Sequence, residues 1–393
     1  MSEWKETSIG NLCTIKHGFA YKGEYITNEK SCNVLVTPGN FTLSGGFKMM
    51  DKPKYYKGPV EKEYILKEGD LIVTMTDLSK GIDTLGYSAL VPKINGITFH
   101  HNQRIGLIEN ISEEVDKGFL YWTMRTRPYQ RFVANSSSGT TVHHTSPNNI
   151  SRYSFLLPPL AEQKNIASIL SSLDDKIAVN RRICENLEAQ AQTLFKHWFI
   201  DFTPFKDGQF VESELGMIPE GWRVGTLGDI AEFKRGKTIT KSETKDGTTP
   251  VVAGGLEPAY YHSQSNTSSR VITISGSGAN AGFIRMYYQP VWASDCSFLD
   301  NSSTALLHTA YCYLKTNKKK VDALQWGAAQ PHVYAKDINK LPFVIPPLEI
   351  LNQFELLITE MFDCIEVNDK ENLRLASLRD TLLPKLMSGQ IRI

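Results

Sequence analysis

An internal duplication constrains the fold of this 393-residue chain more than any other feature. Trp4 and the triplet Lys16-His17-Gly18 are matched by Trp222 and Lys234-Arg235-Gly236 at a constant offset of 218. A repeat of this length predicts one supersecondary scaffold that is built twice. We therefore expect two similar modules rather than a single large domain, and the length of the chain agrees with that expectation.

The later parts of the two copies also match, but at a shorter offset. Gly139 and Pro158-Pro159-Leu160 recur as Gly327 and Pro346-Pro347-Leu348 at an offset of 188, so the first copy carries 30 extra residues between its matched ends. Matched ends around different middles predict one scaffold that presents two different surfaces.

A long helix is expected after each Pro-Pro-Leu, because Pro fits the first turn of a helix. Apolar residues then recur at alternating spacings of three and four for about 40 residues, which is typical of a coiled-coil seam. At ~1.5 Å per residue each helix would be roughly 60 Å long. The predicted seam is Ile166, Leu170, Leu173, Ile177, Asn180, Cys184, Leu187, Ala191, Leu194 and Trp198, with Phe354, Ile358, Met361, Ile365, Asn368, Asn372, Leu375, Arg379, Leu382 and Leu386.

Asn180 and Asn368 occupy equivalent seam positions, where a buried amide costs stability but penalises shifted registers. Arg379 breaks the apolar pattern, and we expect Leu378 to take its place. In the alternative arrangement, each amphipathic helix packs only on its own module. The matching lengths and seams favour pairing of the two helices with each other.

The sequence predicts a mixed α/β (α+β) fold with a pseudo-twofold internal duplication. β-type runs at 70–76 and 270–275 lie between turn-forming residues. A helix is expected around 116–131. Two long antiparallel coiled-coil helices would join two modules, and the expected boundaries are 1–158 and 203–345 for the modules and 159–202 and 346–393 for the helices.

Charge is distributed unevenly, although the whole chain has a formal net charge of only +1. Lys and Arg outnumber Asp and Glu by 18 to 15 in residues 1–158 and by 15 to 13 in residues 203–345, whereas the two helical segments are acidic. Slightly basic modules fit contact with nucleic acid, and acidic helices fit contact with protein.

Several classes of protein are disfavoured by what the sequence lacks. No apolar run approaches the ~20 residues that cross a bilayer, and no signal peptide opens the chain, so we expect a cytoplasmic protein without a membrane partner. The six cysteines form no CxxC pair, which argues against a zinc site or a disulfide framework.

Sequences that resemble catalytic motifs fail on spacing. Gly236-Lys237-Thr238 lacks the first glycine of a phosphate-binding loop, because that position is Ala231. Residues 276–282 lack the third glycine of a dinucleotide-binding loop. Neither Pro-Pro pair belongs to an adenine-methyltransferase motif, since each is followed by Leu. We predict no catalytic residue and no metal ligand, and His100-His101 and His143-His144 have no further ligand nearby in sequence.

The polar loops of the modules suit DNA instead. Cations beside glycines can approach phosphates, and the amide and guanidinium groups of 101–104 are of the kind that read base edges. Arg104 could alternatively pair with a buried carboxylate. The predicted DNA contacts are Lys16, His17, Gly18, Tyr21, Lys22, Thr76, Ser79, Lys80, His101, Asn102, Gln103, Arg104, Thr141 and His143, with Lys234, Arg235, Gly236, Lys237, Ser275, Ser277, Asn280, Gln330 and His332.

The chain resembles the specificity subunits of type I restriction-modification complexes, known as the HsdS family. Residues 158–163 and 346–349, each at the start of a long helix, and the ending 382–389 resemble the conserved regions of that family. Segments 69–79 and 101–106 resemble one class of its target-recognition domains, and segments 274–278, 295–297 and 330–332 resemble another. One departure is 349–351, which stands where the first copy has 161–163 and is expected to alter a contact at the helix start.

This resemblance implies a DNA-binding specificity subunit that catalyses nothing itself. Each recognition domain would read one half of a bipartite, asymmetric target in double-stranded DNA, and the paired helices would set the unread spacer. Two methylation subunits would use S-adenosylmethionine to methylate adenine, and restriction subunits that need ATP and magnesium would join them. None of these cofactors is expected to bind this chain.

Three alternatives remain open at this point. A specificity factor of another methylation-based phage-defence system would share the same scaffold. A coiled-coil adaptor would bind proteins but not DNA. A stand-alone modification enzyme would need its own methyltransferase motifs, and their absence from the sequence argues against it.

Overall fold

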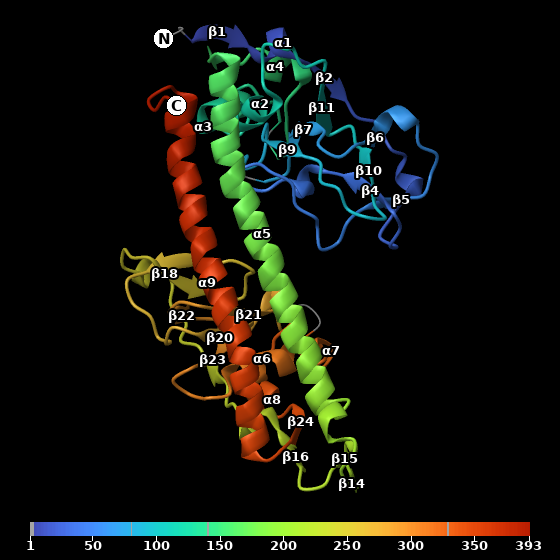
Figure 1. The fold of residues 1–393 in the computed structure, drawn as a ribbon, viewed down its shortest axis with the longest axis vertical. Helices are drawn as coiled ribbons and strands as arrows, with labels where there is room; N and C mark the ends of the chain where they lie inside the picture. Colours follow the sequence, from blue (N-terminus) through green and yellow to red (C-terminus); the bar gives the residue numbers. More distant parts are fainter. Residues whose placement is uncertain (1–3, 80, 140, 328–329) are drawn as a thin grey trace. The chain divides into compact units, whose positions relative to one another are not determined.

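The structure, a computed structural model, describes residues 4–79, 81–139, 141–327 and 330–393. The chain forms two compact units (Figure 1). Unit 1 comprises Met1–Ile177 and Leu373–Ile393, and unit 2 comprises Ala178–Asn372. The long helices α5 (Leu160–Phe199) and α9 (Leu348–Met387) each contribute one half to either unit.

Unit 1 contains two main β-sheets. The first is antiparallel, in the order β2 (Thr14–His17), β11 (Ile105–Glu109), β7 (Leu71–Thr74), β9 (Ser88–Leu90). The second has the order β3 (Ile26–Thr27), β5 (Tyr55–Tyr56), β4 (Asn33–Val36), β10 (Thr98–His101), β6 (Ile65–Leu66), with β4 and β10 parallel. Two strand pairs complete it, β1 (Lys5–Ser8) with β13 (Ser154–Leu157) and β8 (Thr76–Asp77) with β12 (His143–His144). Its helices are α1 (Ile9–Leu12), α2 (Lys117–Thr123), α3 (Arg127–Asn135) and α4 (Pro147–Ser151).

Unit 2 has a corresponding set of elements. Its four-stranded antiparallel sheet has the order β17 (Lys234–Arg235), β23 (Cys296–Asp300), β20 (Val271–Ser275), β21 (Ile284–Tyr287). A smaller sheet has the order β19 (Tyr260–His262), β18 (Thr249–Val252), β22 (Trp292–Ala293), with β18 and β22 parallel. The remaining pairs are β14 (Phe210–Ser213) with β15 (Gly216–Pro219) and β16 (Arg223–Thr226) with β24 (Pro342–Ile345). Its helices are α6 (Leu307–Thr316), α7 (Lys318–Asp322) and α8 (Ala335–Asn339).

The predicted duplication is present in the structure. The order β2-β11-β7-β9 of unit 1 corresponds to β17-β23-β20-β21 of unit 2, and the pair β1–β13 corresponds to β16–β24. Strands at the ends of the two copies keep the offsets seen in the sequence, since β1 and β16 begin 218 residues apart and β13 and β24 begin 188 residues apart. Most of the additional residues of the first copy lie between β4 and β7.

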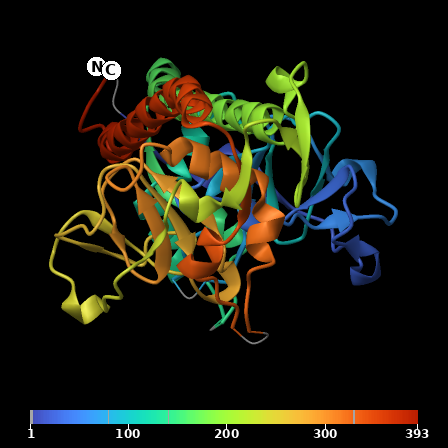
Figure 2. The ribbon, with the colours of Figure 1, turned by 90° about the horizontal axis from the view of Figure 1, so that it is seen from below.

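The long helices pair in antiparallel orientation (Figures 1 and 2). In unit 2, the Asn180 amide donates to Glu371 Oε2 at 2.6 Å, and the rings of Trp198 and Phe354 lie 5.4 Å apart. As the residue numbers increase along α5, those of the contact partners on α9 decrease, which is the pattern of antiparallel helices. All of the predicted seam residues are buried or partly buried.

The seam also contacts the modules. In unit 1, Ile166 and Leu170 of α5 share a core cluster with Phe119 and Leu120 of α2. In unit 2, Phe354 and Ile358 of α9 share a cluster with residues of α6. Each stripe thus packs on its partner helix and on a module at once, so the two arrangements weighed from the sequence coexist.

Asn180 and Asn368, which occupy matching positions of the seam, make different contacts in the structure. Asn180 is fully buried and reaches across to α9, whereas the amide of Asn368 donates to the Cys364 carbonyl of its own helix at 2.8 Å. Of these two residues, Asn180 is therefore the one placed to penalise a shifted register of the helix pair.

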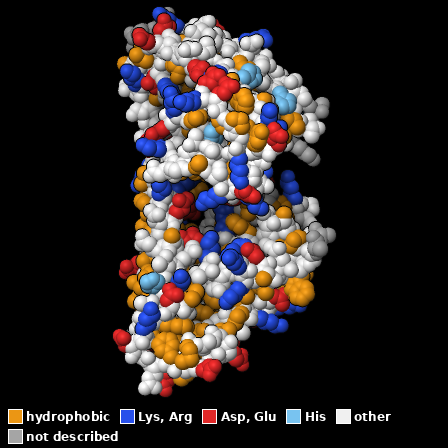
Figure 3. All heavy atoms as spheres, turned by 90° about the vertical axis from the view of Figure 1, so that its right-hand side faces the viewer, with side chains coloured by type: hydrophobic (Ala, Val, Ile, Leu, Met, Phe, Trp, Pro, Cys, Tyr) orange, Lys and Arg blue, Asp and Glu red, His pale blue; other side chains and the backbone are white. Residues whose placement is uncertain are grey.

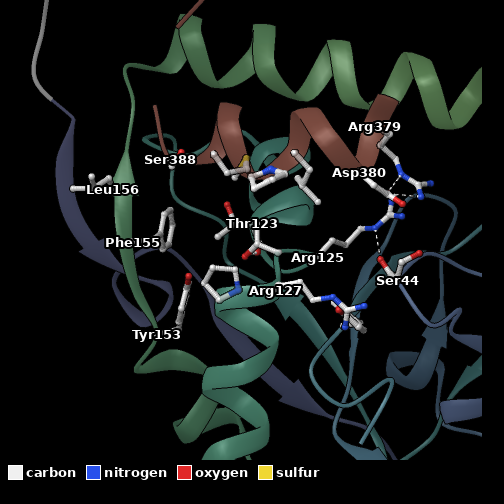
Figure 4. A pocket seen from close by; sticks show the side chains of 16 residues that line it. Ser44, Thr123, Arg125, Arg127, Tyr153, Phe155, Leu156, Arg379, Asp380 and Ser388 are labelled. Atoms are coloured by element: carbon white, nitrogen blue, oxygen red, sulfur yellow. Dashed lines mark hydrogen bonds and ion pairs between the residues drawn. The ribbon is translucent and has the colours of Figure 1, made fainter. Parts of the chain in front are cut away.

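Arg379 itself occupies the seam, so the expectation that Leu378 replaces it is wrong; Leu378 is 47% exposed. Asp174 accepts hydrogen bonds at 2.6 Å from both Arg379 and Arg125. Arg125 also donates to the Ser44 carbonyl at 2.9 Å (Figure 4). These contacts tie α5, α9 and the module of unit 1 together beside a cavity of about 510 Å³.

The helix expected around 116–131 is two helices. α2 ends at Thr123, and α3 begins with Thr126 as its N-cap, whose hydroxyl accepts from the Tyr129 N–H. Pro128 stands in the first turn of α3, where its missing N–H is tolerated. The chain therefore turns between the two helices instead of continuing as one.

The departure at 349–351 does alter a contact at the helix start. In unit 1 the buried Gln163 accepts from the Asp116 N–H and donates to the Glu114 and Pro158 carbonyls. Its counterpart in unit 2 is the buried, apolar Leu351. One turn later, the Glu355 carboxylate accepts from the backbone N–H groups of His308 and Thr309 and anchors α6 instead.

We predict that Asp174→Ala destabilises the chain by about 3–5 kcal/mol, because it leaves the buried Arg125 guanidinium without a counter-charge and leaves Arg379 paired only with Asp380. Burial alone would raise the pKa of Asp174, but the two arginines hold it below its ordinary value. Its contribution is therefore present above the unfolded-state pKa and is lost as the pH falls through the folded-state pKa. Urea unfolding at neutral pH measures the effect.

Asp175→Ala is the matched control for this prediction, since Asp175 is exposed on the same helix turn. The control should stay within about 0.5 kcal/mol of the parent chain. Equal losses for the two variants would show that the ion pairs of Asp174 do not stabilise the fold.

Candidate nucleic-acid interface

Three segments recur at equivalent points of the two units and together carry most of the predicted DNA contacts, although 293–295 of unit 2 carries none. We call them together the loop face of the unit. In unit 1 the segments are 16–22, 101–104 and 138–144, and in unit 2 they are 234–237, 293–295 and 326–332. Residues 80, 140, 328 and 329 lie outside the described residues, and the predicted contact Lys80 is among them.

A glycine lets two segments of each loop face cross closely. A Cβ atom on Gly18 would lie 2.2 Å from the Asn102 carbonyl oxygen, and one on Gly236 would lie 2.4 Å from the Ser294 carbonyl oxygen. The crossing is hydrogen-bonded in both units, for example from the Lys237 N–H to the Ala293 carbonyl at 2.9 Å. Each glycine is therefore required within the fold, because a side chain there would meet protein backbone, and contact of Gly18 and Gly236 with phosphate stays a prediction.

A histidine closes the third segment of each loop face. Main-chain bonds in both directions join Ser138 to His144 in unit 1 and Trp326 to His332 in unit 2. His144 Nδ1 lies 3.1 Å from the Thr76 hydroxyl, and Ser277 forms a β-bridge with His332. Of the predicted residues, Ser277 and His332 are thus brought together in unit 2, whereas in unit 1 Thr76 pairs with His144 and the predicted His143 pairs with Asp77.

Most of the predicted phosphate-binding cations are exposed. Lys22, Arg235 and Lys237 form no ion pair within the described part of the chain, and Lys234 reaches the Ser303 hydroxyl at 3.4 Å. Lys16 differs, since its amine is 2.9 Å from the Glu63 carboxylate and 4.8 Å from the centre of the Tyr64 ring. The hydrogen bond to Glu63 raises the pKa of Lys16, and a ligand phosphate would have to displace that carboxylate.

Four predicted contacts are buried and cannot touch a ligand at the surface. Tyr21 and His101 are buried and pack against aromatic rings of unit 1. Thr76 is buried beside His144, and Ser275 is the last residue of the buried strand β20. His101 Nε2 pairs with the Ile105 carbonyl at 2.9 Å, and burial lowers the pKa of His101 to about 4. A neutral, fully buried imidazole stabilises the fold and has no part in DNA contact.

The remaining predicted contacts are accessible to varying degrees. Gln103 and Arg104 are exposed, and Arg104 forms no ion pair among the described residues, so the alternative in which it pairs with a buried carboxylate is wrong. Those that are exposed or half-buried are His17, Gly18, Ser79, Asn102, Thr141, His143, Gly236, Ser277, Asn280, Gln330 and His332.

Sequence analysis missed a hollow in unit 2. It has a volume of about 590 Å³ and lies beside Asp295, His332 and Tyr334, with Arg235 and Lys336 also lining it. Trp326, which is 64% exposed, belongs to the same loop face. The offset of 218 pairs Asp295 with the buried Asp77 of β8 and the offset of 188 pairs it with Leu107, so neither offset gives its structural equivalent and only strand register reveals its place in the fold.

Charge on the surface is mixed rather than uniform. Figure 3 shows Lys and Arg side chains interspersed with Asp, Glu and apolar groups on one face of the molecule. Within the described ranges, no cluster of three or more His, Cys, Asp or Glu side chains could hold a metal ion. None of the described helices is apolar and long enough to cross a membrane.

Comparison with known proteins identifies the class. The family described as the type I restriction modification DNA specificity domain matches residues 1–189 and 219–374. The chain belongs to this family. The two matches correspond to the two copies of the duplication.

Individual relatives carry the same designation. The chain is 29% identical over 304 residues to the type I restriction enzyme MjaIX specificity subunit of Methanocaldococcus jannaschii, covering 70% of this chain and 69% of that protein. It is 23% identical to the type I restriction enzyme HindI specificity subunit of Haemophilus influenzae over the full length of both. A crystal structure of a type I restriction-modification S subunit from M. genitalium has the same fold, with a TM-score of 0.59, 19% identity and coverage of 98% and 96%.

We predict that Gly18→Ala destabilises unit 1 by roughly 3 kcal/mol, the upper part of the range for overpacking, because the new methyl group would meet backbone atoms that cannot move aside easily. Thermal unfolding of the full chain measures the effect. Gly23→Ala is the matched control, since no atom lies within 4 Å of a Cβ there. A Gly18→Ala chain as stable as this control would contradict the close crossing of the two segments.

Proposed function

We propose that this chain is the DNA-specificity subunit of a type I restriction-modification complex and that each unit reads one half of a bipartite, asymmetric target in double-stranded DNA. One observation carries the proposal. The same loop face occurs in both units, with the same backbone crossings but different side chains. One scaffold that presents two different polar surfaces is what two unrelated half-sites require.

The proposed division of labour follows the duplication. Residues 1–158 and 203–345 form the two target-recognition domains, and 159–202 and 346–393 form the helices of the spacer. The two helices pair in antiparallel orientation, and each proposed recognition domain is followed by a long helix of the same length. The number of unread base pairs between the half-sites then depends on the length of the helix pair.

The proposed partners supply the chemistry. Two methylation subunits would dock on this chain and transfer methyl groups from S-adenosylmethionine to adenine, and restriction subunits would bring ATP-dependent cleavage with magnesium. The duplication supports two methylation subunits, because it offers every docking surface twice. In this proposal the chain itself catalyses nothing, binds none of these cofactors and works in the cytoplasm as part of phage defence.

Domain exchange tests the proposal. Replacing residues 1–158 by the corresponding module of another specificity subunit should change one half of the methylated target and leave the other half intact. The exchange ends immediately before α5, so the helix pair is retained. Sequencing of methylated adenines in a host that carries the complex reads both halves.

The reciprocal exchange of residues 203–345 is the matched control and should change only the other half-site. A change in both halves after a single exchange would contradict independent reading. Absence of any methylated consensus with the parent chain would contradict the proposed function as a whole.

A further inference from the structure

The residue before the central strand carries opposite charges in the two units. The Arg104 carbonyl accepts from the Met75 N–H at 2.9 Å, and the Asp295 carbonyl accepts from the Gly276 N–H at 3.1 Å. Each residue directly precedes a long strand, β11 or β23, and each follows the glycine crossing of its loop face. The backbone therefore has the same hydrogen bond and the same place in the sheet at Arg104 and at Asp295, and the two positions differ in their side chains.

One oxygen of the Asp295 carboxylate is held by a hydrogen bond, and the other forms none with the described residues. Its Oδ2 accepts a hydrogen bond from the Ser277 hydroxyl, while Oδ1 has no hydrogen bond to any described residue. The carboxylate lines the hollow of about 590 Å³ in unit 2. An acceptor held in one orientation beside an accessible hollow can select a hydrogen-bond donor.

The rest of the hollow suits a nucleotide. The rings of His332 and Tyr334 are nearly parallel, 6° apart in plane and with centroids at 6.0 Å. Arg235 and Lys336 form no ion pair within the described residues, and the Lys336 amine lies 5.6 Å from the centre of the Tyr334 ring. Within the described residues, a carboxylate acceptor and two cations without an ion pair are complementary to a base amine and a neighbouring phosphate.

We propose that the hollow of unit 2 binds a base that presents an exocyclic amine, adenine or cytosine, with Asp295 as the acceptor, and that Arg104 at the equivalent place of unit 1 selects guanine. In the major groove the adenine N6 and cytosine N4 amines are donors, whereas guanine presents two acceptors to which arginine binds in bidentate fashion. One position of the scaffold then determines a different base in each half-site. This inference rests on the proposed function.

The test uses the full chain assembled with its methylation subunits. The complex methylates a pool of randomised duplexes in the presence of S-adenosylmethionine, and sequencing of the methylated molecules gives the consensus. Asp295→Ala should reduce, on the order of 10-fold, the preference at one position of one half-site, and that position should be adenine or cytosine with the parent chain. Arg104→Ala should do the same at a guanine in the other half-site.

Asp246→Ala is the control for loss of an acidic charge from unit 2, because Asp246 is exposed and has no hydrogen bond among the described residues; its consensus should equal that of the parent. An unchanged consensus for Asp295→Ala, or a lost position that prefers guanine or thymine, would overturn the inference. If Asp295→Ala melts well below the parent, Arg104→Ala decides alone, since it removes no described side-chain contact. A parent complex without any consensus would instead refute the proposed function.

Discussion

The apolar stripes of α5 and α9 face each other and the modules, and burial of these stripes is the interaction on which both units depend. Unit 1 needs residues 373–393 of α9 and the C-terminus to cover α5, and unit 2 needs residues 178–199 of α5 to cover α9. Each ångström squared of apolar surface removed from water contributes about 25 cal/mol. Unit 1 is therefore completed only by two separate stretches of the chain, whereas unit 2 is one continuous stretch, Ala178–Asn372, that includes a part of each long helix.

The same scaffold solves one packing problem in two ways. Unit 1 buries the charged residues Asp174, Arg125 and Arg379 between its helices and its module. At the offset of 188, unit 2 has Phe362, Tyr313 and Ala191, all buried in one apolar cluster. Replacement of a buried ionic triad by apolar side chains of suitable shape is often neutral or stabilising. The two copies have diverged in chemistry at this point while the backbone architecture has stayed the same.

The sequence predicts the repeating parts of this molecule well, because periodicity and offset are visible without a structure. The duplication, the two helices and the seam follow from spacing alone, and the exposed cations follow from their place in the repeat. The burial of side chains within short strands cannot be predicted from spacing, because it depends on partners that are far away in the sequence. His101 looked like a surface ligand but pairs with a neighbouring carbonyl in the core. The equivalence of Asp295 in unit 2 and Arg104 in unit 1 could be found only from the strand register, because their separation of 191 residues differs from both offsets of the duplication.

The central claim is that one scaffold holds two readers at a spacing fixed by the helix pair, and a paired insertion tests it most directly. Asn180 and Glu371 face each other across the seam, so one heptad inserted after each residue lengthens both helices and keeps their pairing. Seven residues add ~10 Å of helix, or about three base pairs of duplex. The account predicts an unread spacer longer by about three base pairs with both half-sites unchanged, measured by sequencing methylated adenines. An unchanged spacer in an active complex would contradict it.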